Sequence, residues 1–475
     1  MTEQTYKEND QIVEMGENTE ALWQADKKDM TWQETMDYIE ELGQYGIVPG
    51  LINMENLCEK LGHPEQELKF VHIAGTNGKG SVLALISETL KEAGYRVGRY
   101  ISPTIFEYRE RIQINGRPIS KKDLAHQMSL MKEVCELLVA EGKPHPTAFE
   151  VETAVCFNYF KEKQCDIVVL ECGMGGVLDA TNIIQNALVT VFASISYDHM
   201  AILGKTLSEI ASVKAGIMKP GAVAVALKGE PEVEEVLMQK AAGVQIPITF
   251  ADAGEARGIK STLDKQTFSY GPYKNLAITL AGRYQIANAV LALEAVMALE
   301  RTGLQIPEKA VHRGFLKAVW PGRFQVIAKK PYFIADGAHN RDGAAKLVQS
   351  IRFYFTNKRI IYIMGMLRDK EQEEVLKVTT PYAEQILTVP TKGSRGLSAY
   401  DLACMAREYH DRVTSLDSVQ EAVELAYLMA DKDTVIIAFG SLSYLGELIT
   451  LVESISSEKT MDKIMMKVGK DSHGK

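Results

Sequence analysis

The strongest constraint on the fold is a regular alternation of two kinds of segment that begins near Lys69. Short apolar runs rich in β-branched residues alternate with longer segments in which apolar residues recur at helical spacing. The short runs are KFVHIAG, YRVGRYIS, CDIVVLECG, NALVTVFASIS and AVAVAL. Parallel strands need helical crossovers, and strands covered on both faces are apolar throughout. The pattern therefore predicts an α/β fold with a mostly parallel sheet between layers of helices.

The alternation predicts two α/β domains. Shorter strand-like pieces interrupt it over residues 250–280, and near Pro307 it restarts with the strand candidates FIADGAHN, RIIYIMGML, QILTVP and TVIIAFGS. We therefore expect a P-loop domain over residues 31–306 and a smaller α/β domain over residues 307–475. Residues 1–30 are polar and acidic with little periodicity, and we expect an N-terminal tail there.

Charge and cysteine content narrow the class of protein. The chain has 53 Lys and Arg against 62 Asp and Glu, a net charge of −9, which disfavours a nucleic-acid partner because a phosphate backbone needs a basic surface. The six cysteines form no C-x-x-C pair and favour buried thiols in a reducing compartment. We see no signal peptide and no apolar window long enough to span a membrane. We expect a cytoplasmic protein without a membrane or nucleic-acid partner.

A glycine-rich turn joins the first predicted strand to a predicted helix. It reads Gly75, Thr76, Asn77, Gly78, Lys79, Gly80, Ser81. Such a turn places backbone N–H groups around an anion at the positive end of the helix. Lys79 supplies a charge for the phosphates of a nucleotide, and Ser81 a hydroxyl for Mg²⁺ or phosphate. The spacing is a variant of G-x-x-x-x-G-K-[ST], because two residues separate the first two glycines and Gly80 follows the lysine.

Other polar residues follow predicted strands of the first domain. Glu171 ends an apolar strand, where α/β proteins bind ligands, and it holds Mg²⁺, caps a helix or forms a buried ion pair. Asp179 and Asn182 orient a substrate or cap a helix. His199 follows the next strand and is either structural or functional. Lys214 has small and apolar neighbours, so it either extends to solvent or is reactive with a lowered pKa.

The predicted second domain carries three comparable residues. Arg323 lies in WPGRF, and Asp336 and His339 lie in IADGAHN. Each suits contact with a nucleotide across a cleft, and each is equally compatible with a structural role.

Several motifs occur together in a recognisable order. They are GTNGKGS, YISP with RERIQING, LECGMGGVLDATN, DHMAILGKTLSEIASVKAGIMKPG, WPGRF, DGAHN and GSLSYL. Together they resemble the folylpolyglutamate synthase/dihydrofolate synthase family, a branch of the Mur ligases, from about Trp32 to about Ser454. The resemblance implies a P-loop domain, a Rossmann-like second domain and an active site in the cleft between them.

The resemblance also implies the chemistry and the residues that perform it. The activity would be an ATP-dependent amide ligase that adds L-glutamate to folate or dihydropteroate through an acyl phosphate, with two Mg²⁺ ions. Lys79, Lys214 and His199 would be catalytic, Lys214 as a carbamylated lysine. The implied magnesium ligands are Ser102, Glu171, His199 and Lys214; the implied nucleotide contacts are the loop of Gly75–Ser81, Asn288, Arg323 and Asp336; and the implied substrate contacts are Phe149, Glu150, Asp179 and Ala180.

The chain departs from the frequent family pattern at Thr104, Val177 and Val213, where histidine, arginine and glutamate are common. None of these is an implied phosphate or magnesium ligand. Thr104 and Val177 lie on the substrate side, so they bear on pterin specificity. The choice between dihydrofolate synthase, folylpolyglutamate synthase and both stays open.

Two other functions compete with this interpretation. A related ligase that joins an amino acid to a non-folate carboxylate is compatible with the same motifs. A P-loop NTPase switch would hydrolyse nucleotide without an acyl acceptor, and the chain lacks an N-K-x-D-like guanine motif. We favour the folate ligase and expect it to be a monomer.

Overall fold

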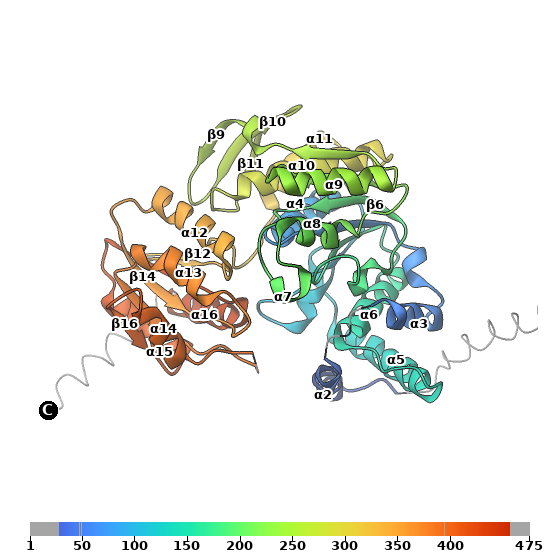
Figure 1. Cartoon of the computed structure of the whole chain (residues 1–475), viewed down its shortest axis with the longest axis horizontal. Helices are drawn as coiled ribbons and strands as arrows, with labels where there is room; N and C mark the ends of the chain where they lie inside the picture. The colour runs from blue at the N-terminus through green and yellow to red at the C-terminus, as the bar shows by residue number, and fades with distance from the viewer. Residues whose placement is uncertain (1–27, 47, 49, 394, 457–475) are drawn as a thin grey trace, which may run out of the picture.

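The computed structural model describes residues 28–46, 48, 50–393 and 395–456. The predicted tail lies outside the described residues except for residues 28–30. Figure 1 shows two α/β bodies, one blue to yellow and one orange to red, each built on its own sheet.

The first sheet has eight strands in the order β4-β3-β2-β5-β1-β6-β7-β8. Six of them are parallel, and β3 and β4 form an antiparallel edge. All five residues of β1 are buried, as the apolar run predicts. The strands are β1 (Phe70–Ala74), β2 (Val97–Tyr100), β3 (Ile112–Ile114), β4 (Arg117–Pro118), β5 (Ile167–Glu171), β6 (Ala187–Phe192), β7 (Val223–Leu227) and β8 (Ile248–Ala251).

Helices cover both faces of the first sheet. One core lies under α4, α10 and α11, and another under α2, α3, α5 and α6 (Figure 1). A capping box of Thr147 and Glu150 starts α6. The helices are α2 (Trp32–Leu42), α3 (Ile52–Lys60), α4 (Lys79–Glu92), α5 (Lys121–Ala140), α6 (Ala148–Glu162), α7 (Met200–Leu203), α8 (Leu207–Ala215), α9 (Pro231–Gly243), α10 (Gln285–Arg301) and α11 (Glu308–Lys317).

The strand-like pieces expected over residues 250–280 contribute β8 and a small antiparallel sheet in the order β11-β10-β9. Its strands are β9 (Arg257–Ser261), β10 (Gln266–Tyr270) and β11 (Tyr273–Ile278). Phe268, Leu276 and Ile278 join the same core as α10, so this small sheet belongs to the first body.

The second sheet has the order β12-β13-β17-β14-β15-β16 and is parallel except at β12. The four strands predicted here are present as β13, β14, β15 and β17. The sequence missed the partly exposed edge strand β12 and the short β16. The elements are β12 (Gln325–Lys329), β13 (Tyr332–Ala335), α12 (Arg341–Tyr354), β14 (Arg359–Met364), α13 (Gln372–Thr379), β15 (Gln385–Thr388), α14 (Ala399–Arg407), β16 (Val413–Ser415), α15 (Val419–Met429), β17 (Thr434–Phe439) and α16 (Leu442–Ser456).

The α/β fold expected from the sequence is thus present. The division between residues 306 and 307 stays a prediction, and α11, which follows it, packs against α4 of the first body, with Gly314 beside Thr89. No helix in the described part of the chain combines the length and apolar character that a membrane span needs.

Candidate active site

The glycine-rich turn lies between β1 and α4, as predicted. Gly75 and Gly78 have φ values of +149° and +94°, which favour glycine. A Cβ on Gly78 would lie 2.5 Å from Asn288 Oδ1, so the loop packs directly on α10. The N–H groups of Thr76 and Asn77 donate to the Ser194 carbonyl oxygen, at 2.7 and 3.2 Å. The N–H groups at the start of α4, from Gly78 to Ser81, are therefore the ones that suit an anion.

Lys79 lies beside Glu171 at the carboxyl edge of the first sheet. Its Nζ donates to the carbonyl oxygens of Gly75 at 3.2 Å and Thr76 at 3.4 Å, and lies 3.8 Å from Glu171 Oε1. Burial raises the pKa of Glu171, although the Lys79 and Arg323 cations act to lower it. The Ile73–Glu171 pair in the β1–β5 register brings this carboxylate next to the loop.

Lys214 reaches the same point from α8. Its Nζ donates to the Gly75 carbonyl oxygen at 3.1 Å, and the residue is only 4% exposed. Burial, and next the charge of Lys79, lower its pKa to about 8. Two ammonium groups from separate helices therefore share one carbonyl acceptor, an arrangement that suits an incoming anion.

His199 begins α7 in a left-handed conformation with φ +50°. Burial, and next the charge of Lys370, lower its pKa to about 4. Its neighbour Asp198 is 7% exposed, and nearby cations and hydrogen bonds hold the pKa of that carboxyl well below its usual range in spite of burial.

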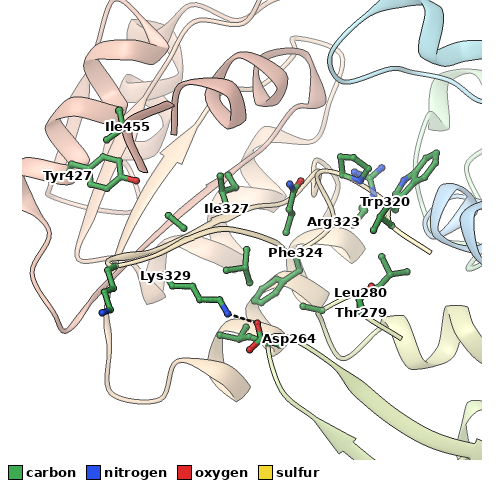
Figure 2. A pocket seen from close by; sticks show the side chains of 18 residues that line it. Asp264, Thr279, Leu280, Trp320, Arg323, Phe324, Ile327, Lys329, Tyr427 and Ile455 are labelled. Atoms are coloured by element: carbon green, nitrogen blue, oxygen red, sulfur yellow. Dashed lines mark hydrogen bonds and ion pairs between the residues drawn. The ribbon is translucent and has the colours of Figure 1, made fainter. Parts of the chain in front are cut away.

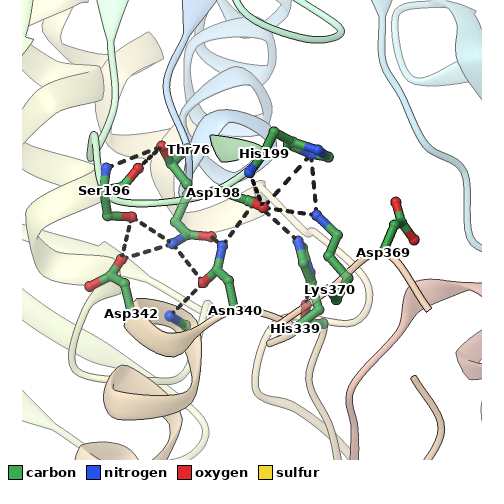
Figure 3. A network of polar contacts seen from close by, with 12 residues as sticks. Thr76, Ser196, Asp198, His199, His339, Asn340, Asp342, Asp369 and Lys370 are labelled. Atoms are coloured by element: carbon green, nitrogen blue, oxygen red, sulfur yellow. Dashed lines mark hydrogen bonds and ion pairs between the residues drawn. The ribbon is translucent and has the colours of Figure 1, made fainter. Parts of the chain in front are cut away.

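Polar contacts join the two bodies around Asp198 (Figure 3). Its carboxylate accepts from Lys370 Nζ at 3.0 Å and from Asn340 Nδ2 at 3.1 Å, and its Oδ2 lies 3.7 Å from His339 Nε2. These three partners follow β13 and β14, so they come from the carboxyl edge of the second sheet.

Asn77 makes a second contact between the bodies. Its Nδ2 donates to Asp342 Oδ2 at 2.8 Å and to Asn340 Oδ1 at 3.2 Å, at the start of α12. The sequence predicted Asn77 as a nucleotide contact, which stays a prediction, and its side chain also binds the second body. Ser196 Oγ approaches the same carboxylate at 3.4 Å.

The implied nucleotide contacts Asn288, Arg323 and Asp336 line the cleft from both bodies and the link between them. Asn288 Nδ2 donates to Gln285 Oε1 at 2.9 Å. Asp336 accepts from Tyr284 Oη at 2.9 Å and from the N–H groups of Phe324 and Ala338, and burial raises its pKa. With these partners the carboxylate also fixes the local structure of the link between the bodies.

Residues 318–324 link the two bodies. Trp320 packs on Gly80 of the loop, so glycine is required there. Arg323 lines the main cleft and also a second cavity of about 810 Å³ (Figure 2). A pair between Lys329 Nζ and Asp264 Oδ1, at 2.7 Å, bridges that second cavity.

The implied substrate residues also line the main cleft. Phe149 packs on Gly173 and near Tyr100, at a ring-centroid distance of 6.0 Å. The Glu150 carboxylate accepts from the Thr147 N–H and Asn53 Nδ2, which makes it a helix cap. Asp179 accepts from the N–H groups of Met174 and Thr181 and holds the turn that contains buried Ala180.

A single cavity of about 1500 Å³ brings the predicted site residues together. Every site residue predicted from the sequence lines it: Gly75, Thr76, Asn77, Gly78, Lys79, Gly80, Ser81, Ser102, Phe149, Glu150, Glu171, Asp179, Ala180, His199, Lys214, Asn288, Arg323 and Asp336. The sequence analysis missed Asp198, Asn340 and Lys370. Each of them follows an apolar strand: Asp198 lies after β6 and next to His199, Asn340 after β13, and Lys370 after β14. That position was the signal available in the sequence.

The donor set fits magnesium that is bound together with a nucleotide. Ser102 and Glu171 offer adjacent oxygen ligands, because the Ser102 N–H donates to the Glu171 carboxylate. Among the residues that the structure describes, no three His, Cys, Asp or Glu side chains converge on one point. Phosphate oxygens, and a carboxylate formed on Lys214, would complete such a site.

Both bodies match known family models. Residues 73–296 match the model described as "Mur ligase middle domain", and residues 322–442 match "Mur ligase, glutamate ligase domain". The chain is 34% identical over 424 residues to the dihydrofolate synthase/folylpolyglutamate synthase of Bacillus subtilis (strain 168), covering 88% of this chain and 98% of that one. It is 32% identical over 432 residues to the protein of the same name from Escherichia coli K12, covering 88% and 95%.

Solved structures agree with these matches. The folylpolyglutamate synthase of Mycobacterium tuberculosis complexed with ADP and AMPPCP superposes with a TM-score of 0.81 at 30% identity, covering 89% of this chain and 99% of that one. E. coli FolC in complex with DHPP and ADP gives a TM-score of 0.77 at 29% identity, covering 90% and 99%.

Proposed function

The chain belongs to the dihydrofolate synthase/folylpolyglutamate synthase family of Mur ligases, and from this premise we propose that it joins L-glutamate to a folate-type carboxylate. It is an ATP-dependent ligase, and we assign ADP and phosphate as the other products. The observation that carries the proposal is the convergence of Lys79 and Lys214 on the Gly75 carbonyl oxygen, in a cleft that also contains Phe149 and Asp179.

The first step activates the carboxylate of the folate-type substrate. A carboxylate is a poor acyl donor, because its oxide oxygen is a poor leaving group. Transfer of the γ-phosphoryl group of ATP converts it into an acyl phosphate. The N–H groups at the start of α4 hold the phosphates, and the Lys79 ammonium offsets the negative charge that builds up during the transfer. Bound Mg²⁺ supplies further charge neutralisation at the phosphate oxygens.

In the second step the amine of L-glutamate attacks the acyl carbon. The tetrahedral intermediate expels phosphate and leaves an amide. Water would hydrolyse the acyl phosphate, so the two bodies must exclude it while the amine arrives. The contacts of Asp198 with Asn340 and of Asn77 with Asp342 hold the cleft walls together during this step.

We assign Ser102, Glu171, His199 and carbamylated Lys214 as the magnesium ligands, for two ions. Carbamylation needs a neutral amine, and the pKa of Lys214, lowered to about 8 by burial and Lys79, supplies more of it than an exposed lysine has. The product carries a negative charge, which would suit the position next to Lys79 better than a second ammonium does.

The test measures phosphate release from ATP and Mg²⁺ with L-glutamate, with the products identified by mass. Three reactions are compared, containing dihydropteroate, tetrahydrofolate or no acceptor. Release that depends on dihydropteroate establishes dihydrofolate synthase activity, and release that depends only on tetrahydrofolate establishes polyglutamate extension. If neither acceptor stimulates phosphate release, the folate assignment is wrong, and the chain is then assigned as a ligase that acts on a non-folate carboxylate.

A matched pair of variants on one helix controls this assay. Lys79→Ala should weaken ATP binding and abolish stimulated release. Lys91→Ala, which removes a lysine paired with Glu88 on the same helix, should behave as the parent protein does. Unchanged ATP affinity in Lys79→Ala would contradict the assignment of the phosphate loop.

We also propose that the enzyme acts in the cytoplasm as a monomer. All six cysteines are free thiols, five of them buried, which suits a reducing compartment. Light scattering of the purified chain at assay concentration tests the second part, and a dimer mass would overturn it.

A further inference from the structure

Lys370 carries a cation from the second body to the edge of the first. It lies in the loop between β14 and α13, and its side chain is 9% exposed. Its Nζ lies 3.0 Å from Asp198 Oδ1 and 3.2 Å from His199 Nε2 (Figure 3). The proposed mechanism gives this buried ammonium no role.

The contact with His199 determines how the imidazole can bind a metal. An ammonium group only donates, so Nε2 of His199 accepts with its lone pair and the ring proton lies on Nδ1. A divalent cation bound to Nε2 would use the same lone pair, at about 2 Å. The cation and the Lys370 ammonium therefore exclude each other at this nitrogen.

Asp198 fixes Lys370 in this position. Its carboxylate also accepts from Asn340 Nδ2 at 3.1 Å and from the His199 N–H at 2.9 Å. If Lys370 leaves, Asp198 keeps these two hydrogen bonds, so the carboxylate is not left without partners. The contact between the bodies therefore survives the displacement of Lys370.

We propose that Lys370 is a positioning residue that competes with a divalent cation for Nε2 of His199. The inference rests on the proposed function in one respect, the assignment of His199 as a metal ligand. Before the cation binds, Lys370 orients the imidazole and neutralises Asp198. When the cation binds, the ammonium moves away from Nε2 and the second body remains attached through Asn340.

The experiment titrates the full chain with Mn²⁺ and measures binding by electron paramagnetic resonance. Spin-echo modulation from an imidazole nitrogen identifies the ion bound to His199. Lys370→Met should bind this ion about tenfold more tightly than the parent protein does, because a charge-assisted hydrogen bond no longer competes. Lys377→Met, which removes an exposed lysine of α13 paired with Glu374, should leave the affinity unchanged.

A second background separates competition at Nε2 from a general charge effect. Removing Lys370 also leaves Asp198 less neutralised, which alone would attract cations. In a His199→Asn background only the charge effect is left, so competition at Nε2 predicts that Lys370→Met gives no gain in affinity there. A gain that persists there, an unchanged affinity in Lys370→Met alone, or Mn²⁺ binding without nitrogen modulation would each overturn the proposal.

These readouts need no folate and no ligase activity. A failure of the folate assignment would leave the Mn²⁺ result intact, whereas a failure of the competition would leave the phosphate-release assay intact. Thermal unfolding of each variant confirms that the fold is retained before the titration is interpreted.

Discussion

Both parallel sheets carry polar side chains at their carboxyl edges. The two edges differ in whether the hydrogen-bond partners of these side chains lie in the same body or across the cleft. At the carboxyl edge of the first sheet, Lys79 and Lys214 both bond to Gly75, within the same body. At the edge of the second sheet, Lys370 and Asn340 bond across the cleft to Asp198. The first edge is complete by itself, whereas the second reaches its geometry only when the bodies meet. We infer that the first sheet holds the chemistry and the second controls when the site is assembled.

The largest expected effect on ligase activity comes from replacing Lys214 at the edge of the first sheet. Lys214→Ala should lower kcat/KM for ligation by about 10²- to 10³-fold, because it removes the proposed carbamate ligand of a magnesium ion that offsets phosphate charge in the transition state. Lys214→Arg keeps a positive charge but forms no carbamate, so it should be as inactive as the alanine variant. The measurement is steady-state ligation with saturating ATP and Mg²⁺.

Labelled bicarbonate supplies the control for the Lys214 variants. The parent protein should show a carbamate carbon signal in ¹³C NMR spectra that both variants lack. Full ligase activity in Lys214→Ala would remove the residue from the mechanism. Activity retained only in Lys214→Arg would show that a cation, and not a carbamate, is needed there.

The contrast between the two edges explains what the sequence could predict. The loop of Gly75–Ser81 is a local signal, because a strand, a glycine turn and a helix follow one another within a short stretch of chain. Glu171 was predictable because it ends an apolar strand, and adjacent strands end at one edge. The alternation likewise predicted both sheets, since burial on both faces leaves a continuous apolar run.

The partners across the cleft had no comparable signal. Lys370 and Asp198 are 172 positions apart, and nothing local to either residue indicates that pairing. Asn77 is predicted as a nucleotide contact because it lies inside the loop, and nothing in the loop indicates that its side chain also binds Asp342. Glu150 is predicted as a substrate contact, and its carboxylate also caps α6. Local patterns identify which residues lie at an edge, but the partner of each side chain depends on how the two bodies pack.

A smaller effect should follow from weakening the contact between the edges. Asn77→Ala and Asp342→Ala should each lower kcat/KM about tenfold or less, because a hydrogen bond of this kind contributes about 1 kcal/mol. The loss should appear mainly in KM for ATP and less in kcat. The backbone N–H groups at the start of α4, which hold the phosphates during the transfer, are unchanged in both variants. The double variant should be about as active as either single variant, because both remove the same contact. Losses that simply multiply would show that the two residues act separately.

The last effect concerns stability, not activity, and distinguishes the two bodies by the pH dependence of their unfolding. His72 is fully buried in β1, its Nε2 lies 2.9 Å from Thr181 Oγ1, and its Nδ1 has no hydrogen-bond partner. Burial, and next the charge of Lys219, lower its pKa to about 3. The unfolded chain takes up a proton below about pH 6.5 and the folded chain does not, so stability falls as the pH drops through this range. Between pH 7 and pH 5 the cost is about 2 kcal/mol.

Native-state hydrogen exchange, corrected for intrinsic rates, can locate this loss. Amides of β1 should lose about 2 kcal/mol of protection on acidification from pH 7 to pH 5, and His72→Gln should remove that part of the slope. Amides of β14 and β17 should change less, because the buried His72 lies in β1 of the other sheet. Equal slopes in the two sheets would mean that the bodies unfold as one cooperative unit. In that case the second body would share the unfolding free energy of the first. The two bodies would then differ only in where the side chains at their sheet edges find hydrogen-bond partners.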